Sequence, residues 1–282
     1  MARRIRLDTE LVRRGLARSR EHAAELVATG RVQLRGARAD KAAAMVDPAD
    51  AVRVLETEGD EYVSRGGHKL AGALDTFAPA GLKVTGRRCL DAGASTGGFT
   101  DVLLRRGASA VVAVDVGYGQ LAWPLRNDAR VTVLERTNVR GLTPDATGGL
   151  VDVTVADLSF ISLRLVLPAL VACTTADGDV VPMVKPQFEV GRDRVGSGGV
   201  VRDPDLRAEA VLDVATAAGE LQLGVAGVAV SPLPGPSGNV EFFLWLRRDA
   251  PPADPGAIRA LVHGAASVAN GAASVANRGP QS

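Results

Sequence analysis

Residues 89–104, which read CLDAGASTGGFTDVLL, decide the fold of this chain. The apolar residues before Asp91 predict a buried strand, and FTDVLL after the glycines predicts a helix. A strand, a glycine-rich turn and a helix in this order are typical of a doubly wound α/β sheet, in which ligands bind at the carboxyl ends of the strands. This stretch therefore predicts both a parallel sheet and a nucleotide-type binding site.

The segments around this turn continue the same alternation over residues 85–250. Helix-compatible stretches separate most of the strand-like segments, so we expect an α/β, Rossmann-like domain with helices on both faces of a mostly parallel seven-stranded sheet. The last two strand-like segments have no helix between them, which indicates an antiparallel pair at one edge. The strand-like segments read RRCLDAG, AVVAVDV, VTVLE, VDVTVADL, GDVVPMVKP, VAGVAVSPL and EFFLWLRR.

The first 62 residues are segregated by charge. The whole chain carries 33 cations and 32 anions, but residues 1–38 hold ten arginines against four acids, and residues 39–62 hold two cations against seven acids. Apolar residues near helical spacing predict two helices, and RVQLRG and AVRVLE predict short strands. We expect a small α+β domain whose basic part meets phosphates, although a solvated basic surface would give the same pattern.

The sequence divides into four expected segments. These are a basic domain over residues 1–58, a glycine-containing linker over 59–68, the α/β domain over 69–250 and a tail over 251–282. The tail contains GAASVAN twice, at 264–270 and 271–277, and offers few large apolar side chains to bury. We therefore expect the tail to be disordered and assign no chemistry to it.

The composition argues against several other classes of protein. Two cysteines are too few for a disulfide framework or a zinc site, so no metal is expected. The longest apolar stretch, residues 166–173, is too short to cross a membrane, and the N-terminus lacks the apolar run of a signal peptide. We expect a soluble cytoplasmic protein with no membrane partner. Only four of the 33 cations are lysines, which raises the question of what arginine cannot do at those positions.

The chemistry of the glycine-rich turn favours a cationic ligand. Its pattern is D-x-G-x-x-x-G-G-F without a basic residue, whereas a dinucleotide site prefers G-x-G-x-x-G facing a pyrophosphate. S-adenosylmethionine, which has a sulfonium and an ammonium group but no phosphate, fits better. Asp115 follows Asp91 by 24 positions, near the spacing at which an acid meets ribose hydroxyls. Asn138 could face the adenine or be an ordinary loop asparagine. The candidate cofactor contacts are Asp91, Gly93, Ser95, Thr96, Gly97, Gly98, Phe99, Asp115, Asn138 and Asp157.

Four charged residues at the ends of expected elements form the candidate catalytic set: Lys69, Asp157, Lys185 and Glu241. Each alone is compatible with a surface charge, but two of the four lysines of the chain fall among them. Methylation of a ribose 2′-hydroxyl requires a group that accepts its proton, and a lysine does so only if burial or a neighbouring cation lowers its pKa. We expect Lys69 to be that neighbour for Lys185, with the two carboxylates orienting the ammonium groups. The Asn/Asp-Pro-Pro-aromatic motif of exocyclic-amine methylation is missing, and neither cysteine is placed for attack on a cytosine ring.

The N-terminal pattern RLDTELVRRGLARSREHAAELVATGRVQLRG, residues 6–36, resembles the αL-motif RNA-binding domain. That domain occurs in a small-subunit ribosomal protein, several pseudouridine synthases and bacterial tyrosyl-tRNA synthetases. The resemblance extends over nearly all of residues 5–55 and implies that the turn and the second helix lie against structured RNA. The candidate RNA contacts are Arg3, Arg4, Arg6, Arg18, Arg20, Lys41 and Arg65.

Residues 62–248 resemble the FtsJ-like ribose 2′-O-methyltransferases through YVSRGGHKL, LDAGASTGGFTD, VDVG, ADLSFISL, VKPQFE and GNVEFFL. The Lys-Asp-Lys-Glu tetrad of that family maps onto the four candidate catalytic residues. Residues 3–248 together resemble the TlyA family of rRNA methyltransferases, historically labelled hemolysins. The resemblance implies methyl transfer from S-adenosylmethionine to the 2′-hydroxyl of a cytidine in ribosomal RNA of one or both subunits. It also implies a link to sensitivity to capreomycin-type antibiotics. We expect a monomer that acts on rRNA or ribosomal subunits.

Two further placements and two other functions stay open. Phe160 could stack on the cofactor or on a flipped target base, or it could be an ordinary core residue. The glycine-rich segment 191–202 is a candidate substrate loop whose arginines meet phosphate.

One alternative function is that of a non-catalytic RNA-binding assembly factor, which would not bind the cofactor. A membrane-active toxin would need a long apolar or strongly amphipathic segment, and none is evident in the sequence.

Overall fold

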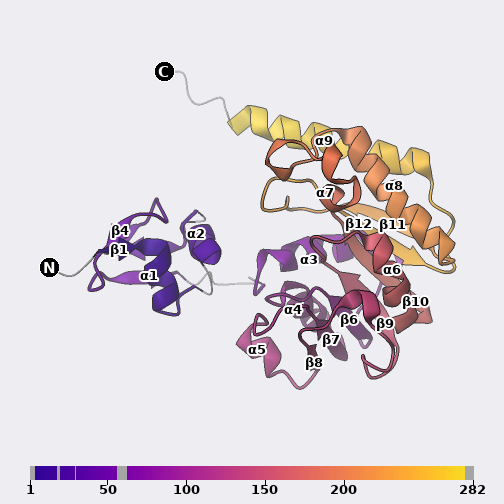
Figure 1. The fold of residues 1–282 in the computed structure, drawn as a ribbon, viewed down its shortest axis with the longest axis horizontal. Helices are drawn as coiled ribbons and strands as arrows, with labels where there is room; N and C mark the ends of the chain where they lie inside the picture. The colour runs from indigo at the N-terminus through magenta and orange to yellow at the C-terminus, as the bar shows by residue number, and fades with distance from the viewer. Residues whose placement is uncertain (1–3, 18–19, 29, 56–61, 277–282) are drawn as a thin grey trace. The chain divides into compact units, whose positions relative to one another are not determined.

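The computed structural model describes residues 4–17, 20–28, 30–55 and 62–276 (Figure 1). They fall into two compact units that meet in the chain between Glu61 and Tyr62. Each unit has its own hydrophobic core. The change in charge pattern along the sequence therefore coincides with a change of structural unit.

The N-terminal unit is a small α+β domain, as the sequence predicts. Helix α1 (Leu7–Arg13) packs against helix α2 (Arg20–Ala28), and Leu7, Leu11 and Leu26 are buried between the elements. Among the described residues, five short strands in a two-stranded and a three-stranded sheet complete the unit. Strand β1 (Ile5–Arg6) pairs antiparallel with β4 (Met45–Val46), and β2 (Val32–Leu34) lies between β3 (Ala37–Arg38) and β5 (Val52–Val54).

The second unit contains the expected seven-stranded sheet, in the order β11-β12-β10-β9-β6-β7-β8. Neighbouring strands from β10 to β8 in that order run parallel. Strand β12 runs antiparallel to both β10 and β11, which confirms the antiparallel pair at the edge. The strands are β6 (Arg88–Ala92), β7 (Ala110–Val114), β8 (Val131–Leu134), β9 (Val151–Ala156), β10 (Thr174–Val184), β11 (Gly224–Val230) and β12 (Phe242–Arg247).

Helices cover both faces of this sheet (Figure 1). Along β7, Val111 and Ala113 point into one core and Val112 and Val114 into the other, as the two-residue period of a strand requires. Helices α3 (Arg65–Phe77) and α4 (Gly98–Arg105) fill the first core; α6 (Leu167–Cys173), α8 (Pro204–Glu220) and α9 (Pro255–Ala276) fill the second. Two one-turn helices, α5 (Trp123–Arg126) and α7 (Pro186–Glu189), follow β7 and β10 in the chain.

The expected linker over residues 59–68 is too long, because its second half belongs to the catalytic unit. Helix α3 already begins at Arg65. Tyr62 packs against the core of this unit, and a Cβ on Gly67 would lie 2.3 Å from the Tyr62 Cβ. This close approach explains the glycine of the motif, since any side chain there would displace Tyr62.

The expected disordered tail is wrong for Pro255–Ala276, which forms helix α9. Ile258 and Val262, one helical turn apart, are buried against the second core, and α9 packs on α8. The small side chains of the repeat can bury little surface, but alanine is the strongest helix former and therefore favours a helix here. Residues 277–282 lie outside the described part of the chain.

Among the described helices, none combines the length and apolarity that a membrane crossing requires. The described residues likewise contain no group of three or more His, Cys, Asp or Glu side chains arranged to hold a metal ion.

Candidate active site

The first pair among the predicted catalytic residues lies where two neighbouring parallel strands end. Asp157 follows β9 directly and Lys185 follows β10, and these strands are paired up to Ala156 and Pro182. Lys185 is buried, and its Nζ lies 2.5 Å from Asp157 Oδ1. The same Nζ donates a hydrogen bond of 3.0 Å to Ser159 Oγ. The Asp157 side chain is 24% exposed, so this pair opens toward the solvent.

The second pair joins helix α3 to the start of β12, the strand between β11 and β10. Lys69 lies in α3, and its Nζ donates a hydrogen bond to Glu241, the residue directly before β12. Both residues are buried, at 7% and 1% exposure. A buried pair of this kind is stable only with good geometry, and loss of one member would leave an unpaired buried charge.

Both pairs lie at the same end of the sheet. A Cβ on Gly66, three residues before Lys69, would lie 3.8 Å from Asp157 Oδ2. The four predicted catalytic residues are therefore brought together as two lysine–carboxylate pairs. Each lysine has its own carboxylate, a pairing that the sequence did not specify.

The glycine-rich turn runs beside the first pair. Gly93 has a φ of +88°, and a Cβ there would lie 2.4 Å from the backbone oxygen of Asp157. Gly97 has a φ of +99° and precedes α4, whose first residue is Gly98. The backbone N–H of Ser95 donates a hydrogen bond of 2.8 Å to Asp115. The turn thus contacts Asp157, a predicted catalytic residue, on one side and Asp115, the predicted ribose-binding residue, on the other.

Asp91 lies beneath this turn and is fully buried. Its Oδ2 accepts a hydrogen bond of 2.7 Å from the Thr100 hydroxyl, whereas its Oδ1 has no partner within the described protein. Burial raises the pKa of Asp91 to about 7, the Thr100 hydrogen bond lowers it, and the charge of Asp157 raises it again. A buried acceptor without a partner requires an explanation, and a cationic ligand group over the turn supplies one.

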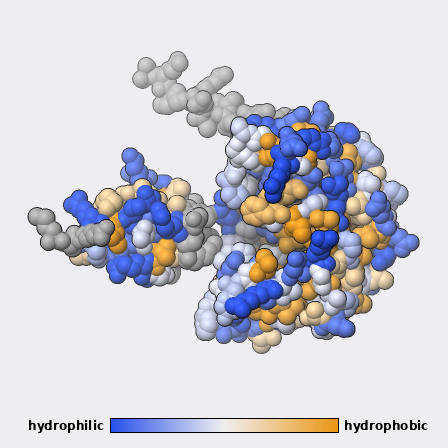
Figure 2. Space-filling view, in the orientation of Figure 1, coloured by the Kyte–Doolittle hydropathy of each residue, from blue (hydrophilic) through white to orange (hydrophobic). Residues whose placement is uncertain are grey.

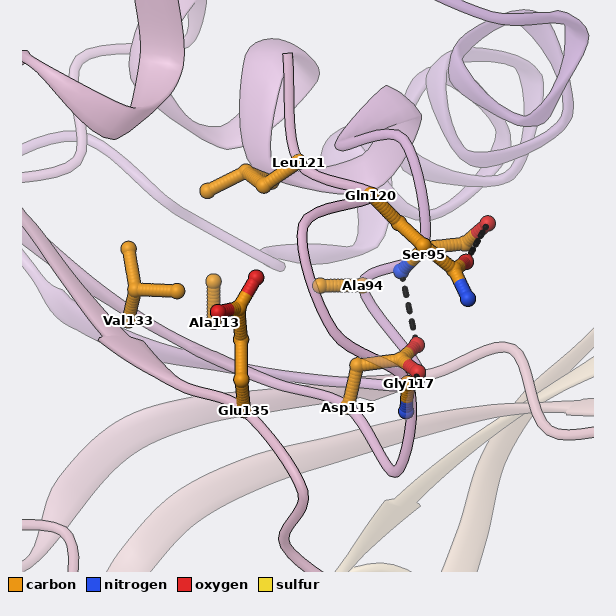
Figure 3. A pocket seen from close by; sticks show the side chains of 9 residues that line it. All are labelled: Ala94, Ser95, Ala113, Asp115, Gly117, Gln120, Leu121, Val133 and Glu135. Atoms are coloured by element: carbon orange, nitrogen blue, oxygen red, sulfur yellow. Dashed lines mark hydrogen bonds between the residues drawn. The ribbon is translucent and has the colours of Figure 1, made fainter. Parts of the chain in front are cut away.

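A pocket between β7 and β8 extends the turn (Figure 3). Asp115 and Glu135 form its acidic side, and the Glu135 carboxylate points into the space between Val133 and Asp115 (Figure 3). Apolar walls with acids at one end suit the adenosine part of a cofactor. The lining residues are Ala94, Ser95, Ala113, Asp115, Gly117, Gln120, Leu121, Val133 and Glu135.

Sequence reasoning missed Gln120 and Glu135 in this pocket. Glu135 follows β8 directly, as Asp115 follows β7, so the rule that ligands bind at the carboxyl ends of strands would have found it. Gln120 lies in the connecting loop, where its Oε1 is 3.3 Å from Ser95 Oγ. No spacing rule in the sequence points to that contact.

Two predicted cofactor contacts point elsewhere. Asn138 is exposed, and its Oδ1 accepts a hydrogen bond of 3.0 Å from the Arg140 N–H, as an ordinary capping residue does. The Phe99 ring is buried in the core, with its centroid 6.0 Å from that of Phe243. These side chains thus have a capping role and a packing role in the structure, and their contact with a cofactor stays a prediction. Thr96 accepts a backbone hydrogen bond of 3.1 Å from Ala122 through its carbonyl.

A second cavity of about 350 Å³ is lined by residues that follow Ser159 and Lys185 in the chain, among them Phe160 and Phe188. Phe160 directly follows Ser159, the hydrogen-bond partner of Lys185, and is 91% exposed with a φ of +64°, so it is not a core phenylalanine. Its ring faces that of Phe188 at a centroid distance of 5.1 Å. Gly191, Arg192 and Gly199 of the predicted substrate loop line the same cavity. An open aromatic pair and a flanking arginine suit a nucleobase.

Two buried residues that the sequence did not single out hold the walls of this cavity. Glu189 accepts hydrogen bonds from the Ser162 hydroxyl at 2.6 Å and from the Leu163 N–H at 2.8 Å, and burial raises its pKa. Asn239 accepts a hydrogen bond of 2.9 Å from the Val201 N–H and donates one of 2.8 Å to the Gly199 carbonyl. Both lie inside the recognised motifs VKPQFE and GNVEFFL, where only the catalytic residue drew attention.

The predicted RNA contacts differ in their surroundings. Arg4 and Lys41 are exposed, whereas Arg6 and Arg20 both pair with Asp8. Figure 2 shows hydrophilic side chains interspersed with hydrophobic ones on the face of the N-terminal unit toward the viewer. Arg65 begins α3 and donates a hydrogen bond of 3.4 Å to a carbonyl in the loop before Glu241. Arg3 and Arg18 lie outside the described residues.

Comparison with known protein families agrees with this geometry. The FtsJ-like methyltransferase family matches residues 62–248, and the S4 domain matches residues 5–52. The chain belongs to the TlyA family of FtsJ-like methyltransferases. The seven-stranded fold and the N-terminal domain expected from the sequence are confirmed, and the chain is a methyltransferase.

Three relatives show how far this likeness extends. The 16S/23S rRNA (cytidine-2′-O)-methyltransferase TlyA of Mycobacterium tuberculosis is 63% identical over 268 residues, 95% of this chain and 99% of the relative. Hemolysin A of Brachyspira hyodysenteriae is 35% identical, over 84% of this chain and 98% of the relative. A solved structure from Streptococcus thermophilus that carries the hemolysin name is 40% identical; the match covers 97% of this chain and 99% of that chain, with a TM-score of 0.77.

Proposed function

We propose that this methyltransferase transfers a methyl group from S-adenosylmethionine to the ribose 2′-hydroxyl of a cytidine in ribosomal RNA. The observation that carries the proposal is the convergence of two lysine–carboxylate pairs beside a glycine-rich turn with an unpartnered acid. The printed function of the Mycobacterium tuberculosis relative supports the choice of nucleoside and RNA. The 2′-hydroxyl is a poor nucleophile, so a site for it must provide a group that accepts its proton.

The residues of the site fit S-adenosylmethionine. Asp91 offers a buried acceptor to a cationic group, Asp115 and Glu135 offer acceptors to hydroxyl or amino groups, and Gly93 lets the turn lie directly against the Asp157 backbone. When bound, the cofactor supplies an electrophilic methyl group on a sulfonium. The role of this chain is to hold that group, orient the hydroxyl and take up the proton.

Lys185 is our candidate for the proton acceptor. Asp157 holds its Nζ at 2.5 Å and Ser159 at 3.0 Å, so the nitrogen is fixed at the rim of the site. In its neutral form this nitrogen takes the hydroxyl proton as the new oxygen–carbon bond forms and the carbon–sulfur bond breaks. Asp157 then stabilises the ammonium that results. Because Asp157 also contacts the turn at Gly93, one residue links the proton acceptor to the cofactor site.

Lys69 supports the same reaction from the opposite side. Its buried ammonium donates to Glu241, and its remaining N–H groups are available to a ribose or phosphate oxygen. A fixed donor there would orient the substrate without exchanging a proton. Gly235 leaves room for Glu241, since a Cβ at position 235 would lie 2.7 Å from Glu241 Oε1.

The aromatic cavity supports a substrate base drawn out of its stack. The exposed ring of Phe160 and the ring of Phe188 offer a stacking surface next to the residues that hold Lys185. Placing a ribose hydroxyl against Lys185 requires that the nucleotide leave its helix, as enzymes that modify paired nucleotides commonly arrange. The S4 domain would supply the affinity for folded rRNA.

We further propose that the enzyme works as a monomer in the cytoplasm.

Methylation of 16S and 23S rRNA with purified protein and radiolabelled S-adenosylmethionine tests this function. We expect label on a cytidine and resistance of that one linkage to alkaline hydrolysis, because the 2′-hydroxyl is blocked. Label on a base would contradict ribose methylation. A protein that binds rRNA but neither binds the cofactor nor incorporates label would instead be an assembly factor.

A further inference from the structure

Two arginines at the starts of the two N-terminal helices share one buried carboxylate. Arg6 precedes α1 and Arg20 begins α2. Asp8 accepts hydrogen bonds from Arg6 Nε at 3.0 Å and Arg6 Nη2 at 2.6 Å, and its Oδ2 lies 3.3 Å from Arg20 Nη2. The Thr9 N–H donates to the same carboxylate at 2.7 Å. These donors, with Arg6 first among them, hold the pKa of Asp8 well below its usual range.

The exposure of these side chains is uneven. The Asp8 side chain is 6% exposed, whereas those of Arg6 and Arg20 are 45% and 57% exposed. Asp8 binds one edge of the Arg6 guanidinium, which leaves Nη1 without a bond to it. A guanidinium held along one edge can still donate from another edge to a phosphate oxygen. The buried acid thus presents two cations to solvent rather than neutralising them in the core.

We propose that Asp8 is a positioning residue of the RNA surface, whose carboxylate holds Arg6 and Arg20 together as a preformed site for one phosphodiester of rRNA. The proposal rests on the proposed function, because it names the group that the N-terminal domain grips. Two long side chains that are fixed before binding lose less conformational entropy when the phosphate arrives. A planar guanidinium fork also matches the phosphate oxygens better than a mobile point charge does.

Loss of the negative charge of Asp8 is expected to weaken RNA binding rather than tighten it. Replacement of an acid near an RNA surface normally tightens binding, because the net charge becomes more positive. Asp8→Asn keeps the shape of the side chain but removes the charge that aligns the arginines. We expect it to raise the Kd for rRNA about tenfold and to lower the slope of log Kd against log salt by about one, since one phosphate contact is lost.

Glu10→Gln is the matched control on the same helix. Glu10 is also a buried acid that pairs with two arginines, Arg13 and Arg14, and its substitution changes the net charge by the same amount. Neither of these arginines is a predicted RNA contact. If Asp8 acts only through charge or through the stability of the domain, the two variants should behave alike. We expect Glu10→Gln to bind rRNA as tightly as the wild type or more tightly.

The experiment measures binding of the full-length protein to transcribed 16S and 23S rRNA at several salt concentrations. Weaker binding by Asp8→Asn alone supports the proposal; equal or tighter binding, or an equal loss in both variants, overturns it. Arg6→Ala and the double variant provide a second measurement, since Asp8→Asn should add little once Arg6 is gone. Wild-type protein that binds rRNA but does not methylate it would contradict the proposed function and leave this test intact.

Discussion

The two units use the same bond, a carboxylate paired with a basic side chain, in opposite surroundings. In the N-terminal unit the acid is buried and its partners reach into solvent, with Asp8 at 6% and Arg20 at 57% side-chain exposure. In the catalytic unit both partners are buried, with Lys69 at 9% and Glu241 at 1%. Arginine stays charged at any accessible pH and offers a fork, whereas lysine can lose its proton. The comparison suggests that this chain uses arginine to grip phosphate and keeps lysine where a proton must move.

Replacement of Lys185 by arginine is the strongest test of this difference between the roles of arginine and lysine. Lys185→Arg keeps the positive charge beside Asp157 but cannot accept a proton, so we expect kcat to fall by about 10³-fold. The Kd for S-adenosylmethionine should change by less than about twofold, because Lys185 does not line the cofactor pocket. Single-turnover methylation and calorimetric binding measure the two quantities.

Lys83→Arg is the control, since Lys83 is an exposed lysine of the same unit. It should retain wild-type turnover. A Lys185→Arg enzyme with near-normal kcat would show that charge alone is needed at that position, and the proposed proton acceptor would then be wrong.

The cofactor site should respond to pH through Asp91. Burial raises the pKa of this carboxyl to about 7, so it is mostly neutral below that pH and charged above it. Only the charged form attracts the cationic groups of S-adenosylmethionine. We therefore expect the Kd to be constant above about pH 8 and to rise toward tenfold for each pH unit below 7. Isothermal titration calorimetry from pH 6 to 8 measures this profile.

Two controls separate Asp91 from other titrating groups. Asp91→Asn should bind S-adenosylmethionine weakly at pH 8 and show no further loss on acidification. Adenosine, which lacks both cationic groups, should bind the wild type with a flat profile. An unchanged pH profile in Asp91→Asn would assign the titration to another residue.

A smaller effect is expected at Glu189, a buried acid that holds a loop rather than a cation. Glu189→Ala removes the hydrogen bonds from Ser162 and Leu163, which fix the segment that follows Phe160. We therefore expect the KM for rRNA to rise about tenfold, while cofactor binding stays unchanged. Glu189→Gln should recover most of the affinity, because an amide can accept from the Leu163 N–H and donate to the Ser162 hydroxyl.

Asp179→Asn controls for a general loss of stability. Asp179 is a buried acid in the middle of β10, six positions before Lys185, and accepts hydrogen bonds from Arg87 and Trp245. This variant should lower the unfolding temperature without a change in KM. If Glu189→Ala and Asp179→Asn raise KM alike, the Glu189 effect is one of stability and not of loop position.

The sequence predicted the parts of the site that follow from topology. Asp157 and Lys185 each follow a strand, and the carboxyl ends of parallel strands must share one edge, so their meeting could be expected from the alternation of elements. The glycine-rich turn was equally readable, because Gly93 adopts a φ that favours glycine and lies against a backbone oxygen.

The sequence did not predict which charges pair. Glu241 and Lys69 are separated by 172 positions, and only the packing of α3 beside the sheet decides that they meet. Asp8 and Glu189 look like surface acids in a charged sequence, and their burial depends on three-dimensional contacts. Helix α9 was missed for a different reason, since two buried residues, Ile258 and Val262, suffice to dock an alanine-rich helix.

The smallest effect is expected when arginine is replaced by lysine on the RNA surface. Arg6→Lys keeps the charge but loses the fork that binds Asp8, so we expect the Kd for rRNA to rise only about three- to fivefold. The salt dependence should stay close to that of the wild type, because the number of cations near phosphate is unchanged. Arg4→Lys is the matched control, since exposed Arg4 carries the same charge and is not held by Asp8. Binding at several salt concentrations measures both variants. If Arg6→Lys binds as the wild type does, charge alone serves the RNA surface, and geometry matters only where lysine meets the reacting hydroxyl.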